Sequence, residues 1–268
     1  MSNPCLALLN SVLAVRVNSA VNEFVLRTQD LISTGVTDDR FTQLVSLASR
    51  HVPRQMLAPS REEDQLAAAL IPGWSLAAWS LLDLVRVSFV LSRHDLADAD
   101  FPPKFNQWFR FADEGEACAY YRSLCLLPQP EQHLWRAAEG CRTNMRSVFA
   151  AVACDSPYAF LHFDSLVWNQ MLLKALFIGE PLTGIYGFNK RTTPELIAMV
   201  NDYIDERRSA GRDIPARLEM GHGGQLEAPR QRLPGRQRCT AGIGHGTAGS
   251  AHAHDQGRQA RQVNVLAH

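Results

Sequence analysis

The amino-acid sequence predicts an all-α fold. Residues that start and end helices punctuate it almost throughout, with proline in first turns and glycine after last turns. Segments with the alternating pattern of a β-strand are nearly absent. Hydrophobic residues make up 46% of the 268 residues, which suffices for a sizeable core. We therefore expect a single domain of antiparallel helix pairs over residues 1–220, arranged as a bundle or an α/α superhelix.

Four helices are predicted in the first part of the chain, most of them beginning at a capping residue. They run from Asn3-Pro4 to about Ser33, from Thr37 to about His51, from a capping box at Ser60 and Glu63 to Ile71, and from Ser75 to Ser92. The last one lies in the longest apolar stretch, which contains Asp83 and Arg86 near its middle. A membrane span would bury both charges in lipid, so we interpret this stretch as a core helix.

The second part of the chain is also predicted to be helical. The expected helices run from Phe105 to Leu126, with Gly115 as a potential break, from Pro130 to about Val152, from Pro157 to Gly179, and from a capping box at Thr192 and Glu195 to about Ala210. In the helix that begins at Pro130, apolar residues recur at spacings of three and four residues, which places them on one face of the helix. They are Leu134, Ala138, Cys141, Met145, Val148 and Val152.

The composition changes abruptly after Met220. Residues 221–268 contain no Phe, Trp or Tyr and are dominated by Gly, Ala, Arg, Gln and His. Such a segment cannot bury enough surface to fold, so it is interpreted as a disordered tail. A frameshift in a GC-rich gene is a further hypothesis, because codons read out of frame produce this mixture. Resequencing the gene would test that hypothesis.

Charge and cysteine usage exclude several functions. Lys plus Arg and Asp plus Glu both total 27, so no net positive field exists to bind a nucleic acid. Six scattered cysteines form no C-x-x-C pair, so neither a zinc site nor a redox dithiol is indicated. No signal peptide, membrane span, metal site or cofactor motif is recognisable. We expect a cytoplasmic protein without a metal or cofactor.

Polar residues stand on apolar helices between Cys141 and Phe177, and they form the candidate site. His162, Ser165 and Asn169 fall on one stripe of a continuous helix, and Gln170 and Lys174 fall on an adjoining stripe. His162 is the candidate general acid or base. The candidate ligand-binding residues are Glu139, Arg142, Asn144, Arg146, Asp155, Tyr158, Asp164, Asn169, Gln170 and Lys174.

Two interpretations of these polar residues are open. In the first, Glu139, Arg142 and Arg146 of the preceding helix face the His162 stripe across a pocket, where Arg142 and Lys174 hold an anionic group. In the second, the same groups satisfy one another as a buried polar network. Asp155 is likewise either a metal or substrate ligand or an acidic residue favoured by a helix N-terminus.

Four segments in the second part of the chain carry a family signature. They are LLPQPEQHLWRAAEGCRTN (126–144), VFAAVACDSPY (148–158), HFDSLVWNQMLLKALFIGEPL (162–182) and PELIAMVNDYIDERRSAGR (194–212). With a weaker match at 72–91, they resemble the EboA-domain family over about two thirds of the chain. The family usually has Asn-Pro-Tyr where this chain has Ser156-Pro157-Tyr158. It also has a short apolar ending that is absent here after Leu218.

The resemblance implies a role in a pathway that makes or exports a secondary metabolite. It implies no reaction. The first hypothesis is a non-catalytic helical binding or scaffold protein, whose partners are other Ebo-cluster proteins or a small-molecule metabolite. The alternative is an enzyme of unfamiliar type that uses His162 on a small polar or phosphorylated metabolite.

Overall fold

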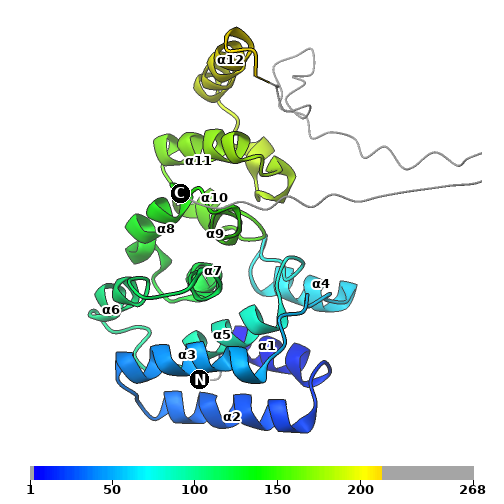
Figure 1. The fold of residues 1–268 in the computed structure, drawn as a ribbon, viewed down its shortest axis with the longest axis vertical. Helices are drawn as coiled ribbons and strands as arrows, with labels where there is room; N and C mark the ends of the chain where they lie inside the picture. The colour runs from blue at the N-terminus through cyan, green and yellow to red at the C-terminus, as the bar shows by residue number, and fades with distance from the viewer. Residues whose placement is uncertain (1–2, 213–268) are drawn as a thin grey trace, which may run out of the picture. The chain divides into compact units, whose positions relative to one another are not determined.

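The computed structural model describes residues 3–212, which are helical almost throughout (Figure 1). The tail predicted after Met220 lies outside the described residues. Within them, no strand is formed, and the single β-bridge joins Met56 and Ser80. The predicted all-α class is confirmed. The part of the chain that the structure describes contains twelve α-helices: α1 (Pro4–Ala14), α2 (Ser19–Ser33), α3 (Asp38–His51), α4 (Arg61–Leu70), α5 (Leu81–Leu91), α6 (Phe101–Trp108), α7 (Glu114–Ser123), α8 (Leu134–Cys141), α9 (Arg146–Ala153), α10 (Tyr158–His162), α11 (Ser165–Ile178) and α12 (Pro194–Ser209).

Short 3-10 helices connect several of these elements. They are η1 (Leu124–Leu126), η2 (Pro130–His133), η3 (Leu182–Gly184) and η4 (Phe188–Lys190). None of the helices within residues 3–212 is long and apolar enough to cross a membrane.

Two predicted helix starts are confirmed. The Thr37 hydroxyl accepts a hydrogen bond from the backbone of Arg40 and begins α3. Ser60 and Glu63 form the predicted capping box at the start of α4. The start of α12 differs by one residue, because Thr193 caps this helix in place of Thr192.

The predicted long helices are wrong in the first half of the chain, because polar caps interrupt them. The helix expected from Asn3 to Ser33 breaks before Asn18, whose side chain caps α2. The helix expected from Ser75 begins only after Ser80, which forms a capping box with Asp83. Asp113 caps α7, so the break expected at Gly115 lies just before that residue. Each of these short side chains replaces a backbone partner that a continuous helix would supply.

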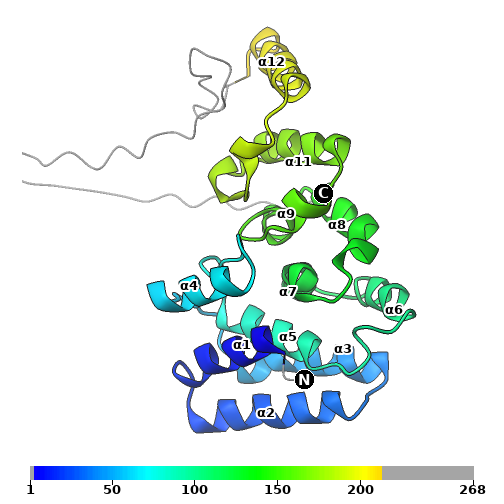
Figure 2. The ribbon, with the colours of Figure 1, turned by 180° about the vertical axis from the view of Figure 1, so that it is seen from behind.

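Helix α5 lies at the centre of the core. All of its residues except Asp83 are buried, and it packs against α1, α3 and α7. Helix α7 in turn lies between α5 and α9, as both views show (Figures 1 and 2). This placement puts Arg86 of α5 inside the protein, with 1% of its surface exposed. Its charge therefore requires acidic partners from neighbouring helices.

The helices from α8 onward lie on the side of α7 away from α5, with α9 packed directly against α7 (Figure 2). Gly140 of α8 makes this approach close, because a Cβ at this position would lie 2.6 Å from the ring of Tyr121 on α7. Helix α11 contacts α8 and α9, and α12 contacts α11. The polar residues singled out in the sequence lie on these later helices.

Candidate functional site

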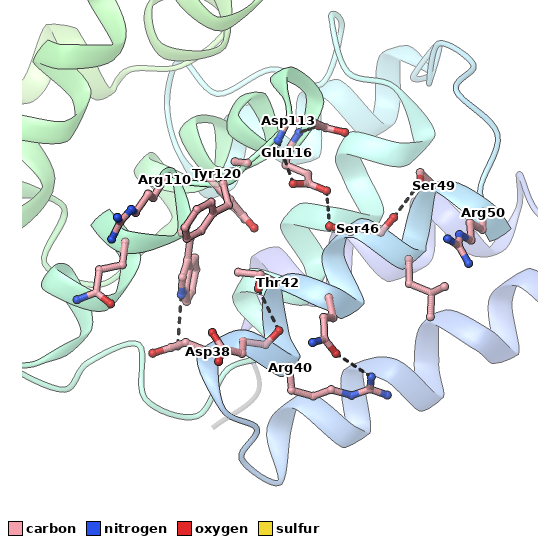
Figure 3. Close-up of a pocket in the computed structure, with 17 residues that line it drawn as sticks. Asp38, Arg40, Thr42, Ser46, Ser49, Arg50, Arg110, Asp113, Glu116 and Tyr120 are labelled. Atoms are coloured by element: carbon pink, nitrogen blue, oxygen red, sulfur yellow. Dashed lines mark hydrogen bonds between the residues drawn. The ribbon is translucent and has the colours of Figure 1, made fainter.

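A cavity of about 1000 Å³ lies between α3 and the segment that runs from the end of α6 into α7 (Figure 3). We call it the α3–α7 cavity. One wall is a polar face of α3 that includes Asp39, Thr42 and Ser46, spaced as on one side of a helix. Glu116 and Tyr120 of α7, four residues apart, belong to the opposite wall.

The Glu116 carboxylate belongs to the buried floor of this cavity. Only 7% of the residue is exposed. The Ser46 hydroxyl donates a hydrogen bond of 2.6 Å to Glu116 Oε1, and the Asp113 backbone N–H donates one of 3.1 Å to Oε2. The carboxylate thus joins the two walls and caps α7 at the same time.

Arg86 supplies the opposite charge from behind Glu116. Its Nη2 lies 3.5 Å from Glu116 Oε1, and its Nη1 lies 3.8 Å from Asp113 Oδ1. Its Nε donates to the Val45 carbonyl at 3.2 Å. A Cβ at Gly115 would lie 2.9 Å from this guanidinium, so glycine permits the approach. The arrangement is a buried ion pair held by three helices.

A second buried arginine lies between Asp95 and Asp38 at the edge of the cavity. Arg93 Nη1 lies 3.1 Å from Asp38 Oδ1, and the same guanidinium holds Asp95 through hydrogen bonds of 2.7 and 2.6 Å. These bonds lower the pKa of Asp95. Phe41 and Trp108 enclose the guanidinium, each with a ring centroid 5.1 Å away.

Tyr120 presents a free hydroxyl to the cavity. The residue is 1% exposed, and its hydroxyl points into the cavity (Figure 3). This hydroxyl has no hydrogen-bond partner within residues 3–212. Burial raises the pKa of Tyr120 further above its usual range, so the phenol is a neutral donor at ordinary pH. A bound molecule could accept this hydrogen bond.

The predicted stripe of His162, Ser165 and Asn169 is not formed. His162 ends α10, Phe163 is extended, and Asp164 caps α11 by accepting a hydrogen bond of 2.8 Å from Val167 N. The expected continuous helix from Pro157 to Gly179 is therefore wrong. A polar capping side chain interrupts it, as in the first half of the chain. The His162 ring packs against Tyr158, with centroids 4.9 Å apart.

The basic candidates of this region are paired near the surface. The helix expected from Pro130 to Val152 is interrupted between α8 and α9, so Arg142 and Arg146 lie on separate segments. Arg142 binds Glu139 one turn before it. Arg146 donates to Glu180 at 2.6 Å, and this hydrogen bond raises the pKa of Arg146.

A second cavity, of about 240 Å³, brings together three of the predicted residues. Arg142, Gln170 and Lys174 line it, together with apolar side chains of α8 and α11. Lys174 Nζ also donates to Asn144 Oδ1 at 2.5 Å. His162 and Asn169 are not among its lining residues. Asn169 is buried, and its Oδ1 has no hydrogen-bond partner within residues 3–212.

Asp155 and Tyr158 hold the turn between α9 and α10. Asp155 has a positive φ of 54°. Its backbone N–H donates to Gly184, and its carbonyl accepts from Ser75, both at 3.0 Å. Burial raises the pKa of its carboxyl group. The Tyr158 hydroxyl donates to the Pro130 carbonyl at 2.6 Å, so its hydrogen bond serves the fold.

The residues of the α3–α7 cavity do not stand out in the sequence. The polar face of α3 is typical of an ordinary solvated surface, and Asp113 with Glu116 is typical of a capping box alone. The signal that points to this place is Arg86. A cation in the most apolar stretch of the chain requires a buried carboxylate elsewhere, and Glu116 supplies it.

The fold is all-helical over residues 3–212, and an open cavity with polar and apolar lining lies between α3 and α7. The family described as metabolite traffic protein EboA matches residues 5–220, and the chain belongs to this family. No curated protein and no solved structure matches the chain. The family description suggests a role in metabolite traffic.

Proposed function

We propose that this protein is a non-catalytic binding component that holds a small metabolite while an Ebo-type pathway makes or exports it. The α3–α7 cavity carries the proposal. Its volume of about 1000 Å³ suits a small organic molecule. Its floor combines a fixed Glu116 carboxylate with a free Tyr120 hydroxyl, which are the kinds of group that orient a ligand.

The buried ion pairs support a binding role because they make the floor rigid. Glu116 is held by Ser46, by the Asp113 backbone and by Arg86, so its position is set before a ligand arrives. A preorganised site loses less conformational entropy on binding. The family description as a metabolite traffic protein agrees with this role.

The enzyme alternative with His162 gains no comparable support. His162 lines neither of the two cavities described above, and its ring packs against Tyr158. The α3–α7 cavity contains no histidine or cysteine among its lining residues. We therefore propose binding as the function of this site.

Copurification of a metabolite tests the proposal. The full chain, produced in its natural host, is purified without denaturation, and mass spectrometry compares the small molecules released from two variants. Gln43→Trp puts a large ring at the exposed wall of the α3–α7 cavity. Gln65→Trp puts the same ring on an exposed position of α4, away from the cavity lining.

We expect one released compound to be present with the unmodified chain and with Gln65→Trp, and to be depleted at least severalfold with Gln43→Trp. Equal amounts from both variants, or no retained compound from any of them, would contradict binding in this cavity. Circular dichroism verifies that the two variants contain the same amount of helix.

We further propose that other proteins of the same pathway exchange the metabolite with this one in the cytoplasm. All cysteines within residues 3–212 are free thiols, which supports a reducing compartment. A tagged full chain should retain at least one protein encoded beside it. If each of those proteins, tested singly, fails to bind, the partner proposal is wrong, while metabolite binding stands on its own test.

A further inference from the structure

We infer that the α3–α7 cavity selects a small organic anion, with a carboxylate or phosphate group and a flat or apolar body. The inference rests on the proposed binding function and adds the chemical class of the ligand. It depends on the difference between the acidic and the basic side chains around the cavity. Three of the four lining carboxylates lie within 4 Å of a buried arginine, whereas the rim arginines have no carboxylate partner within residues 3–212.

Three of the four acidic side chains that line the cavity, of which only Glu116 is buried, already have cationic partners. Glu116 and Asp113 face the buried Arg86, at 3.5 and 3.8 Å. Asp38 faces the buried Arg93 at 3.1 Å. A cationic ligand would have to compete with guanidinium groups that cannot leave.

The basic side chains at the rim have no carboxylate partner within residues 3–212. They are Arg40, Arg50 and Arg110. Arg40 donates to the neutral Gln43 at 3.3 Å, and Arg110 lies over the Phe111 ring at 5.2 Å. Figure 3 shows the three arginines at different sides of the opening. With Arg86, Arg93 and Asp95 included, five arginines and five carboxylates surround the cavity, so it is the unpaired rim arginines, and not a net positive charge, that favour an anion.

Asp39 is the exception among the acidic residues. It is exposed on the α3 wall, and no arginine or lysine within residues 3–212 pairs with its carboxylate. An anionic ligand would be repelled by this carboxylate, whereas a cationic ligand would be attracted to it. Asp39 therefore distinguishes the two classes of ligand.

The remaining contacts suit the uncharged body of the ligand. Tyr120 offers a hydroxyl without a partner within residues 3–212, and Phe111 offers a ring that is 86% exposed at the rim. Trp108 and Leu47 also belong to the lining. An aromatic or other flat group could pack here while the anionic group reaches an arginine.

Three probes of similar size and different charge test this inference on the full chain. They are phenyl phosphate, benzyl alcohol and benzylammonium, each titrated by isothermal calorimetry or ligand-observed NMR. We expect phenyl phosphate to bind most tightly, and its affinity to fall as salt is raised, because rim charges are screened. Binding of benzylammonium more tightly than phenyl phosphate would overturn the inference, as would no binding of phenyl phosphate.

Single substitutions locate the binding. Arg40→Gln, Arg50→Gln and Arg110→Gln are compared with Arg27→Gln, which removes an arginine on α2 that pairs with Glu23 outside the cavity. We expect at least one of the rim variants to weaken phenyl phosphate binding by about two- to fivefold and Arg27→Gln to leave it unchanged. Tyr120→Phe should weaken binding by about three- to tenfold through loss of one hydrogen bond.

The Asp39→Asn variant tests whether the bound ligand is anionic or cationic. It should leave phenyl phosphate binding unchanged or strengthen it, and a weakening would overturn the inference. Rim variants that behave like Arg27→Gln would also overturn it. A neutral or cationic compound recovered in the copurification experiment would overturn the anion inference alone, whereas equal recovery from Gln43→Trp and Gln65→Trp would remove the cavity's binding function itself.

Discussion

The two polar regions of this protein hold their charges in different ways. In the α3–α7 cavity, Glu116 and Arg86 are buried and come from helices far apart in the sequence. In the α8–α11 region, which comprises residues 134–178, Arg142 binds Glu139 within one turn, and both side chains are partly or largely exposed. The sequence pattern of the α3–α7 cavity is ordinary, whereas that of the α8–α11 region predicts either a ligand pocket or a buried polar network.

The difference follows from the energy of burying a charge. An ion removed from water must find its partner within the fold, and the partner's place is set by tertiary packing. An exposed ion can remain in water and pairs weakly with whatever lies beside it. Polar residues on an apolar helix therefore indicate a buried charge network less reliably than a single cation in a core helix does.

Arg86→Met is the substitution that would damage the α3–α7 cavity most. It leaves Glu116 buried with its hydrogen bonds but without its counter-charge. We therefore expect the free energy of unfolding to fall by about 3–5 kcal/mol. Urea denaturation followed by circular dichroism measures this loss. A loss below about 1 kcal/mol would mean that Arg86 does not neutralise Glu116.

The double variant Arg86→Met with Glu116→Gln is the control. Because both charges are then removed, the neutral amide has only its hydrogen-bond partners to satisfy, and part of the stability should return. If the double variant is as unstable as the sum of the two single variants, the two side chains are not coupled.

Two tyrosines allow the same substitution in both regions. Tyr158 donates its hydroxyl to the Pro130 carbonyl, whereas the Tyr120 hydroxyl has no partner within residues 3–212. We expect Tyr158→Phe to cost about 1–2 kcal/mol of unfolding free energy, and Tyr120→Phe to change it by less than about 0.5 kcal/mol. Equal losses in urea denaturation would contradict the assignment of the Tyr120 hydroxyl to a ligand.

His133, which lies in the segment between the two regions, should make the stability of the protein depend on pH. It packs edge-on against the rings of Phe101 and Phe105, 6.0 and 5.0 Å away, and its Nδ1 has no hydrogen-bond partner within residues 3–212. Burial lowers the pKa of His133 from 6.5 to about 4. Between these pH values the unfolded chain binds the additional proton, so stability should fall as pH decreases from 6.5 towards 4.

The measurement is a series of thermal unfolding curves across this pH range. His133→Gln should reduce the slope of the unfolding free energy against pH by an amount that corresponds to up to one bound proton per molecule. His94→Gln, at an exposed histidine, is the matched control. An unchanged slope in His133→Gln would show that other groups cause the loss of stability in acid.

The sequence was sufficient for the fold class and for most helical segments, but not for the breaks within them. Thr37 and the Ser60 capping box were identified correctly because their acceptor groups precede clear helical patterns. Asn18 and Asp164 were not expected to end one helix and begin another. A capping side chain and a polar side chain on a helix surface are indistinguishable in sequence until packing decides between them.

The same limit applies to the sites. Arg86 indicates a buried partner, but only the packing of α5 against α7 shows that this partner is Glu116 and that a cavity opens beside it. For the predicted set, the structure brings Arg142, Gln170 and Lys174 to one small cavity and leaves His162 outside its lining. The assumed continuous helix is what placed His162 with Asn169.

Arg142→Met gives the smallest expected effect and repeats the Arg86 substitution in the α8–α11 region. The Arg142 side chain is 64% exposed, and Glu139 can keep its charge in water when its partner is removed. We expect a change in unfolding free energy of less than about 0.5 kcal/mol by urea denaturation. A loss similar to that of Arg86→Met would mean that residues 134–178 also contain a buried charge network, and the contrast between the two regions would then fail. A small loss would leave Arg142 free to serve a ligand in the smaller cavity, because its charge is not needed by the fold.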